Sequence, residues 1–415
     1  MTRDVTDELS GMRAAVAADE EARRARATLG WIAEPGDDRI GRAVDDLGAA
    51  EVLSLLRRDE LPAGYRPRPS YRHRLAALDT ARVERDLERA SANELRFVCP
   101  GDSEWPTQLD ALGPKRPLAL WLRGASDLRL ASLRSVAIVG SRAASDYGTY
   151  VASDLGFGLG EQGWTVVSGA AYGIDAATHR GVLAAGGSTV AVLACGADVS
   201  YPRGHESLLA RIADEGVIVS ELPPGTAPTR QRFLERNRVI AALTRGAIVI
   251  EAAVRSGALS TASWARELDR IVMGVPGPIT STMSAGVHRL LQQEHARLVC
   301  SVADVVELVG QLGRDLAPQP RGPERLRDTL DHAALAVLEA VPGRTGGDVS
   351  AVAAAAGVDV DEALSQLGSL LLLGLVERIE GRWRLSRRAR ASPTEQPRVG
   401  PAKPVDQASA QQLVI

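Results

Sequence analysis

Six short apolar runs between Ser135 and Gly277 constrain the fold more than any other feature of this sequence. Each run is rich in β-branched residues, and helical patterns separate the runs, which are VAIVG, WTVVSG, STVAVLACG, GVIVSE, GAIVIEA and RIVMGVPG. Apolar strands spaced by helices form βαβ units, which build a parallel sheet with helices on both faces. The sequence therefore predicts an α/β fold whose ligands bind beyond the carboxyl ends of the parallel strands.

The segments on either side of this series predict further domains. Alternating charges among alanines and leucines, from residue 6 to about 96, are typical of a small all-helical domain. The segment GRDLAPQPRGPERLRD is rich in proline and charge and predicts a linker. Three helical patterns and a hairpin turning at Glu380 and Gly381 then suggest a winged helix, followed by a tail expected to be disordered. We expect domains at 1–94, 95–312 and 329–390, a linker at 313–328 and a tail at 391–415.

The composition excludes several classes of protein. The 415 residues carry a formal net charge of −3, so any surface that binds nucleic acid must be local. All but two of the 49 basic residues are arginine, the exceptions being Lys115 and Lys403, so a single arginine says little about function. Three distant cysteines and scattered histidines predict neither a disulfide framework nor a metal site. Without a secretory signal or an apolar run of about 20 residues, we expect a cytoplasmic protein that does not span a membrane.

The turn after the first apolar run indicates an anion site. A dinucleotide site requires G-x-G-x-x-G there and an acid after the second strand. Here Gly140 is followed by Ser141 and Arg142, and the second run ends in Ser168 and Gly169, so NAD binding is not expected. Backbone N–H groups, a hydroxyl and a guanidinium at a helix start suit a phosphate. The alternative is a tight turn in which Arg142 is only solvated.

Two further turns repeat this chemistry. The turn after the second run adds Tyr172, whose ring could stack on a base, and then Asp175 and His179, for which a structural hydrogen bond is favoured over catalysis. After the fifth run, RSGALSTA places small residues and hydroxyls at another helix start, with Ser256, Gly257 and Thr261 as candidates. Three such turns on one edge of a sheet describe a groove for a phosphate backbone better than a pocket for one nucleotide.

The segment FLERNRVIAAL places two arginines before an apolar run. Residues two apart on a helix point in nearly opposite directions, so Arg236 and Arg238 can share a face only if the helix begins at or after them. The prolines of ELPPGTAPTRQR favour such a late start. We therefore predict a pre-helical clamp for successive phosphates, with Asn237 pointing away to cap the helix or hold the turn. The alternative is a salt bridge on the surface, for instance with Glu235.

Seven motifs occur in an order that closely resembles one protein family. They are VAIVGSR, SGAAYGIDAATHRG, YPRGHESL, VIVSELPPG, FLERNRVIAAL, RSGALSTA and VPGPI. Over about residues 97–308 the sequence resembles DNA-processing protein A, also called Smf, with a looser match to that family's flanking helical (SAM-like) and winged-helix domains. The resemblance implies an extended Rossmann fold and a cytoplasmic homodimer that binds single-stranded DNA and loads the RecA recombinase during natural transformation. It implies no catalytic activity and no cofactor.

The resemblance also implies which residues meet DNA. They are Gly140, Ser141, Arg142, Ser168, Gly169, Arg236, Asn237, Arg238, Ser256, Gly257 and Thr261. The sequence departs from the family at several positions. Tyr172 stands where many members have a basic residue, His205 and His288 replace a common asparagine, and Glu294 and His295 replace Gly-Ala.

Two other functions fit parts of the sequence. Nucleotide phosphoribohydrolases of the lysine-decarboxylase-like group share this kind of sheet, but their catalytic glutamate is replaced by Trp264 in RSGALSTASW. Alternatively, the winged helix could be the main reader of duplex DNA, since its end GRWRLSRRAR is basic. The leading hypothesis is a single-strand DNA-binding protein that is not an enzyme.

Overall fold

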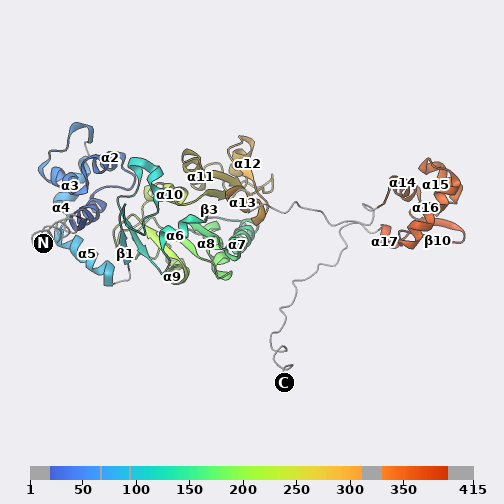
Figure 1. The fold of residues 1–415 in the computed structure, drawn as a ribbon, viewed down its shortest axis with the longest axis horizontal. Coiled ribbons are helices and arrows are strands. Elements are labelled where there is room, and N and C mark those ends of the chain that lie inside the picture. Colours follow the sequence, from blue (N-terminus) through green and yellow to red (C-terminus); the bar gives the residue numbers. More distant parts are fainter. Residues whose placement is uncertain (1–18, 66–67, 93–94, 311–329, 391–415) are drawn as a thin grey trace, which may run out of the picture. The chain divides into compact units, whose positions relative to one another are not determined.

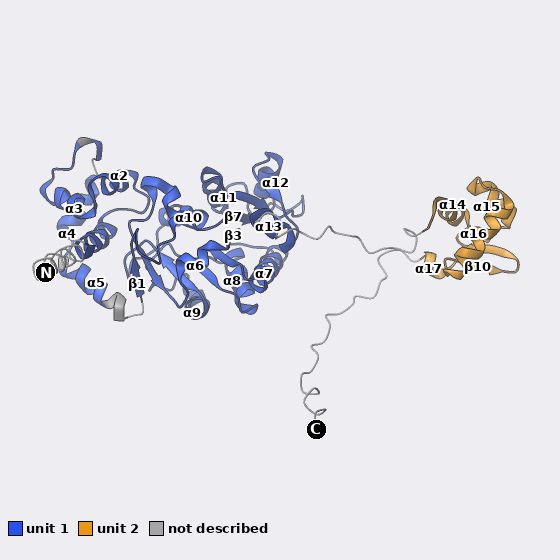
Figure 2. Ribbon diagram, in the orientation of Figure 1, with its two compact units in different colours: residues 1–318 blue, residues 319–415 orange. Residues whose placement is uncertain are grey.

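The computed structural model describes residues 19–65, 68–92, 95–310 and 330–390. The chain divides into two compact units, residues 1–318 and 319–415 (Figure 2). The N-terminal helices and the sheet both belong to the first unit. The predicted linker and tail lie outside the described residues.

The first unit is built on a sheet of nine strands in the order β1-β2-β6-β5-β4-β3-β7-β8-β9. The six predicted runs form its central parallel strands, so the predicted α/β fold with a parallel sheet is confirmed. These strands are β3 (Ser135–Val139), β4 (Thr165–Ser168), β5 (Thr189–Val192), β6 (Val217–Ser220), β7 (Gly246–Val249) and β8 (Ile271–Gly274). At one edge β1 (Leu95–Val98) and β2 (Leu120–Arg123) run antiparallel, and at the other β9 (Arg297–Leu298) pairs with β8.

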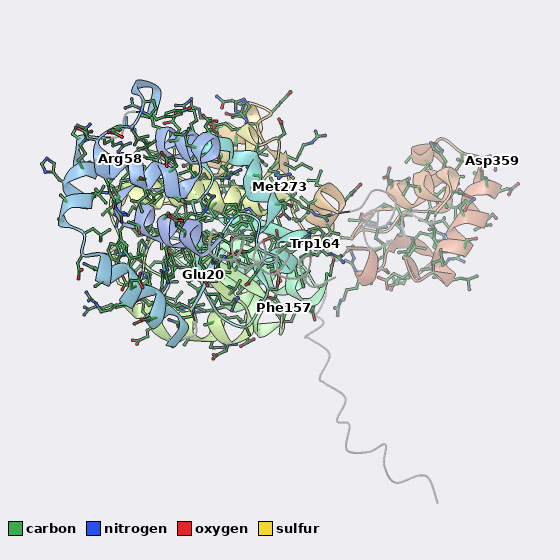
Figure 3. All side chains as sticks on the ribbon, turned by 60° about the vertical axis from the view of Figure 1, so that its left-hand side comes forward. Glu20, Arg58, Phe157, Trp164, Met273 and Asp359 are labelled. Carbon is green, nitrogen blue, oxygen red and sulfur yellow. The ribbon has the colours of Figure 1, made fainter. Side chains whose placement is uncertain are left out.

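Helices cover both faces of this sheet (Figure 1). In β3, Val136 and Ile138 belong to one apolar cluster while Ala137 and Val139 belong to another, because successive side chains of a strand point to opposite faces. One face packs mainly against α10 (Arg230–Leu243) and α11 (Ala258–Glu267). The other packs against α7 (Asp146–Glu161), α8 (Ile174–Ala184), α9 (Glu206–Glu215) and α13 (Val302–Val309). Trp164 and Met273 are buried in this second layer (Figure 3).

Close packing of α7 on α8 depends on glycine. A Cβ on Gly156 would lie 2.7 Å from the carbonyl oxygen of Thr178, and one on Gly181 would lie 2.2 Å from that of Ser153. Both distances are shorter than van der Waals contact, so a larger residue would force the two helices apart. The short helices α6 (Leu128–Leu133) and α12 (Ala285–Gln292) pack on the same face as α10 and α11.

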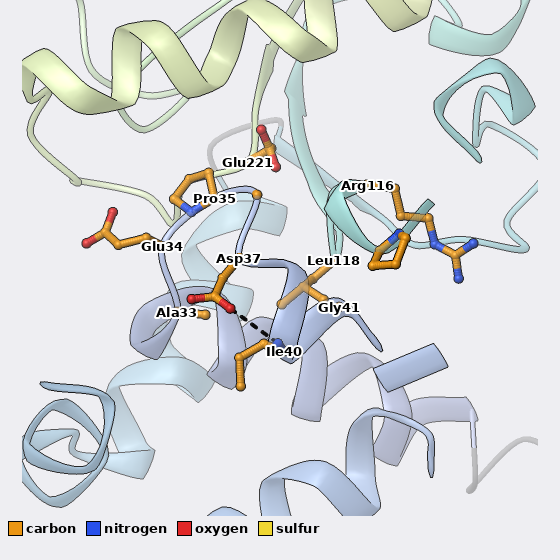
Figure 4. A pocket seen from close by; sticks show the side chains of 12 residues that line it. Ala33, Glu34, Pro35, Asp37, Ile40, Gly41, Arg116, Leu118 and Glu221 are labelled. Carbon is orange, nitrogen blue, oxygen red and sulfur yellow. Dashed lines mark hydrogen bonds between the residues drawn. The ribbon is translucent and has the colours of Figure 1, made fainter. Parts of the chain in front are cut away.

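The N-terminal helices form their own apolar cluster around Ile32, Val52 and Tyr71. They comprise a helical segment at 19–32, then α2 (Asp38–Leu47), α3 (Ala49–Arg58), α4 (Pro69–Ala77) and α5 (Thr80–Ala92). Where these helices meet the sheet, a cavity of about 30 Å³ is lined by residues that include Asp37, Arg116 and Glu221 (Figure 4). We call the contact between these helices and the sheet the seam.

The second unit contains three helices followed by a two-stranded hairpin, in the predicted order. The helices are α14 (His332–Ala340), α15 (Val349–Ala356) and α16 (Val360–Leu372), and the strands are β10 (Val376–Ile379) and β11 (Arg382–Leu385), with a short α17 (Arg387–Arg390) after them. Glu380 and Gly381 both have positive φ, which confirms the predicted turn. Within the described residues of the whole chain, no helix is both long and apolar enough to cross a membrane.

Candidate nucleic-acid interface

A cavity of about 830 Å³ lies at the carboxyl ends of the parallel strands. It opens where the strand order reverses between β3 and β7, which is the usual ligand position in a sheet of this kind. We call it the edge cavity. Its lining includes these predicted site residues: Gly140, Ser141, Arg142, Arg236, Asn237, Ser256, Gly257 and Thr261. Two of the three turns expected to form a groove, those after β3 and β7, therefore line one cavity.

The turn after β3 presents a side chain rather than a nest of free N–H groups. The backbone N–H of Ser141 donates to Glu251 O at 2.8 Å, and that of Ala143 donates to Ser141 Oγ at 3.2 Å. These two donors are therefore already satisfied within the protein. Arg142 is exposed, and its guanidinium carbon lies 4.4 Å from the centre of the Phe233 ring. That contact holds the cation at the wall of the edge cavity, where it can pair with an anion.

Arg236 lies at the floor of the edge cavity and is 7% exposed. One Nη1 hydrogen bond goes to the carbonyl oxygen of Val192, and Nε has no partner among the described atoms. Burial lowers the pKa of Arg236 to about 10, the nearby carboxylate of Asp175 opposes this shift, and Arg142 adds to it. At neutral pH the floor of the cavity therefore carries a buried cation with an unused donor.

Gly169 makes room for this arginine. A Cβ at position 169 would lie 2.0 Å from Arg236 Nη1, so no larger residue fits while Arg236 keeps its place. The backbone N–H groups of Gly169 and Ala171 donate to Asp175 Oδ2 at 3.1 and 3.3 Å, which fixes the turn after β4. Gly169 therefore shapes the site from beneath rather than lining the cavity.

The hydroxyl of Ser168 does not face a ligand, contrary to what a phosphate-binding turn would require. Ser168 is fully buried, and its Oγ donates to Ile138 O at 2.6 Å across the sheet. Tyr172 is 52% exposed and lies outside the cavity lining, edge-on to His205 with ring centres 4.6 Å apart. The structure thus places Ser168 beneath the site and Tyr172 at its margin.

His179 makes a structural hydrogen bond, as predicted, but to Thr189 rather than to Asp175. The two atoms, Nδ1 and Oγ1, are 2.8 Å apart, and the Thr189 hydroxyl itself donates to Val166 O at 2.7 Å. Nδ1 must therefore be the protonated nitrogen. Burial, with a smaller contribution from Arg236, lowers the pKa of His179 to about 3, so the ring is neutral at physiological pH.

The predicted late start of the helix is wrong. α10 begins at Arg230 and is capped by Thr229, whose Oγ1 accepts from the N–H of Arg232 at 3.4 Å. The prolines of the preceding connection end before this cap, so they do not delay the helix. Arg236 and Arg238 therefore both lie within the helix and point in different directions.

Arg238 is fully buried and is held by an ion pair. Its Nη1 and Nη2 each lie 2.5 Å from a carboxylate oxygen of Glu221, and its Nε donates to Lys115 O at 2.8 Å. The surface pair with Glu235 that the sequence suggested is replaced by this buried pair. A Cβ on Gly36 would lie 3.2 Å from Arg238 Nε, which places Arg238 at the seam with the N-terminal helices. It does not line the edge cavity.

The sequence predicts that Asn237 points away from the site to cap the helix or hold the turn, and the structure differs. It lines the edge cavity, and its Nδ2 donates to the carbonyl oxygen of Gly257 at 3.2 Å. This bond joins α10 to the turn that begins α11. Asn237 thus helps to position Gly257 and the neighbouring serines.

Sequence reasoning missed an aromatic pair in this site. Tyr201 and Phe233 line the edge cavity, and their ring centres are 5.7 Å apart. Phe233 could have been found, because it lies one helical turn before Arg236 and Asn237. Tyr201 begins the motif YPRGHESL in the irregular connection after β5, but nothing in that motif shows that its ring faces the cavity. The described residues contain no group of His, Cys, Asp and Glu side chains placed to bind a metal.

Comparison with known proteins identifies the family. Residues 96–310 match the family model described as DNA recombination-mediator protein A. A DNA processing protein DprA of Mycobacterium tuberculosis is 42% identical over 374 residues, which cover 88% of this chain and 94% of that protein. Protein Smf of Escherichia coli is 37% identical over 298 residues, or 70% of this chain and 78% of that one. The X-ray structure of DprA from Streptococcus pneumoniae aligns with a TM-score of 0.58 and 30% identity, covering 69% of this chain and 96% of that chain. The chain belongs to the DprA/Smf family of DNA processing proteins.

Proposed function

We propose that this chain binds single-stranded DNA in the edge cavity and helps to load a RecA-type recombinase on the bound strand. The observation that carries the DNA proposal is the convergence of Arg142 and Arg236, from two different elements, on one cavity that also holds aromatic rings. Proteins that bind single strands combine cations along the backbone with aromatic surfaces for the bases. We propose recombinase loading, a homodimer and a cytoplasmic location from the family resemblance.

The edge cavity offers three kinds of contact. Arg142 and the unused Nε of Arg236 would pair with phosphates. Neutral donors surround them, namely the hydroxyls of Ser141, Ser256, Ser260 and Thr261 and the amide of Asn237. Tyr201 and Phe233 provide stacking surfaces. Because none of these contacts requires a particular base edge, binding should discriminate little among sequences.

The other predicted site residues form the wall of the edge cavity, support it from beneath or lie at its margin. Gly140 and Gly257 are part of the cavity wall, where the backbone lies close to a ligand. We propose that Gly169 and Ser168 act indirectly by fixing the turn and the floor, and that Tyr172 offers a stacking surface at the margin. For Arg238 we propose support of the helix and seam rather than contact with DNA.

A salt titration of Arg142→Ala tests this proposal. Affinity for a labelled oligothymidylate should fall, and the slope of log K against log salt should flatten by about 0.7, because one phosphate contact is lost from a single strand. Arg129→Ala is the matched control, since Arg129 lies in α6, which leads into the amino end of β3, whereas the edge cavity lies at the carboxyl ends of the strands. Equal affinities and slopes for wild type and Arg142→Ala would contradict the assignment of the edge cavity.

The enzyme alternative lacks its carboxylate in this cavity. The position of the phosphoribohydrolase glutamate is taken by Trp264, and the carboxylate in the lining, Asp175, accepts two backbone hydrogen bonds at its Oδ2. We therefore propose a binding protein rather than an enzyme. Release of free base from nucleoside monophosphates by the purified protein, absent from Asp175→Asn, would overturn this view.

We propose that the second unit is a winged helix that contacts duplex DNA weakly, through its hairpin. The helix that would enter a groove, α16, begins with Asp361 and Glu362 and exposes Leu364 and Leu372, a surface unsuited to phosphates. The hairpin instead carries the exposed Arg382. Removing residues 314–415 should leave single-strand affinity unchanged and lower duplex affinity; loss of single-strand binding would place the main site in the second unit.

A further inference from the structure

A third cavity, of about 350 Å³, lies where the N-terminal helices meet α11. We call it the seam cavity. Its lining comes from α2, from the 3-10 segment η2 (Thr107–Lys115) and from α11: Asp38, Arg42, Ala111, Leu112, Pro114, Lys115, Trp264, Glu267 and Leu268. The proposed function assigns nothing to this cavity.

One face of α11 connects the two cavities. Ser260 lines the edge cavity, and Trp264, four residues later on the same face, lines the seam cavity. Four residues rise about 6 Å along a helix, a step that one nucleotide can span. A strand leaving the edge cavity along α11 would therefore reach Trp264 next.

Trp264 and Lys115 form a cation–π pair in the seam cavity. The Lys115 Nζ lies 5.0 Å from the centre of the Trp264 ring, and Trp264 is half-buried against the core. Lys115 is the only lysine among the described residues, and the chain's one other lysine is Lys403. An ammonium on a flexible stem can leave a ring face and pair with a nearby phosphate more readily than a stacked guanidinium can.

The backbone of Lys115 is held firmly in place. Its carbonyl oxygen accepts from Arg238 Nε at 2.8 Å, and Arg238 is fixed by its bidentate pair with Glu221. The buried arginine thus positions Lys115 beside Trp264. Arg238, which the sequence predicts to contact DNA, therefore supports a neighbouring residue instead.

The charges of the seam cavity suit a base better than a row of phosphates. Arg42 is already paired with Asp38 at 2.7 Å, which leaves Lys115 and Glu267 as the other charges, one of each sign. An exposed carboxylate such as that of Glu267 accepts hydrogen bonds from the amino groups of cytosine or adenine. A flat aromatic ring and a balanced charge are features of a base site.

We propose that the seam cavity receives a nucleobase of the strand whose phosphates lie in the edge cavity. Trp264 is the stacking surface, and the Lys115 ammonium moves from the ring to the adjacent phosphate. This inference rests on the proposed function, since it needs a strand in the edge cavity. The competing role of Trp264 and Lys115 is to close the seam between the helices and the sheet.

Oligodeoxycytidylates of increasing length, from about 4 to about 16 nucleotides, distinguish these roles by fluorescence anisotropy. The shortest strands fill the edge cavity alone, and longer ones also reach Trp264. Trp264→Ala should weaken binding of the long strands by between about 5- and 150-fold, the range measured for loss of one base stack, and leave the short strands unaffected. Trp264→Phe keeps a ring and the packing, so it should recover most of the loss. Lys115→Met should flatten the salt slope by about 0.7 for the long strands only.

Each outcome decides between the proposals. Loss of affinity at every length in Trp264→Ala, with no recovery in Trp264→Phe, would show a structural role and overturn the inference. Equal binding of wild type and both Trp264 variants at every length would also overturn it, while leaving the edge cavity intact. Wild-type protein that binds no oligonucleotide at all would refute the proposed function itself. Quenching of tryptophan fluorescence by a long strand, present in wild type and missing in Trp264→Phe, would support direct contact.

Discussion

The sequence and the structure assign different roles to Arg238. The sequence predicts that it contacts a phosphate, whereas the structure shows it in a buried ion pair with Glu221. In the structure its side chain is 0% exposed and that of Glu221 is 10% exposed. Replacing one partner of such a pair leaves the other buried and uncompensated, which costs about 3–5 kcal/mol. We therefore expect Arg238→Met to destabilise the first unit by about that amount. Since a loss of 1 kcal/mol lowers Tm by about 2 °C in a domain of about 250 residues and by less in a larger one, Tm of this unit should fall by several degrees.

A double variant separates the ion pair from the rest of the site. Replacing a buried pair by apolar residues is often close to neutral, so Arg238→Met combined with Glu221→Leu should recover much of the stability lost in the single variant. Calorimetry of the full chain is the assay, because the second unit should unfold in its own transition and serve as an internal reference.

DNA binding by the same variants completes the test. Short oligothymidylates should bind Arg238→Met with the wild-type salt slope at a temperature where the variant is folded. Unchanged stability together with a slope flattened by about 0.7 would mean that Arg238 contacts a phosphate. That result would refute the structural role.

Three other changes test the floor of the edge cavity, the buried His179 and the wall of the edge cavity in turn. Gly169→Ala places a Cβ 2.0 Å from Arg236 Nη1, so it should displace Arg236 and reduce single-strand affinity, with the salt slope flattened by about 0.7; an unchanged slope would contradict this. The pKa of His179 is about 3 in the folded protein and near 6.5 in the unfolded chain. Between these two pH values the unfolded state binds more protons, so the free energy of unfolding falls as the pH falls. His179→Gln should lose less stability than wild type between pH 6.5 and 3, which urea unfolding at several pH values would measure. Phe233→Ala removes a stacking surface and the ring that orients Arg142, so it should weaken binding about tenfold or more at low salt, and full retention of affinity would refute the aromatic contribution.

The sheet and the position of the site could be predicted from the sequence for a simple reason. Fully buried parallel strands appear as short continuous apolar runs, and their carboxyl ends meet at one edge. The turns that begin at Gly140 and Ser256 therefore had to face the same place, and they do. Local composition and chain topology are enough for this step.

The directions of individual side chains could not be predicted in the same way. The partner of Arg238 is Glu221, at the end of a different strand, and nothing near FLERNRVIAAL indicates that a carboxylate will be buried there. The partner of Ser168 is a carbonyl oxygen on the neighbouring strand β3. The start of α10 differs from the prediction because the prolines do not delay the helix, which Thr229 caps directly after the last of them.

The arrangement of Arg236, Asn237 and Arg238 follows from helical geometry. Successive residues of a helix are rotated by about 100°, so three in a row at a buried point must face three different neighbours. In α10 they reach the end of β5, the turn before α11 and the carbonyl group of Lys115 respectively. A tripeptide with two arginines would be a poor clamp for consecutive phosphates, since one helix face cannot present both. It is well suited to fix the floor of the edge cavity through Arg236, one wall of that cavity through Asn237, and the backbone of Lys115 in the seam cavity through Arg238.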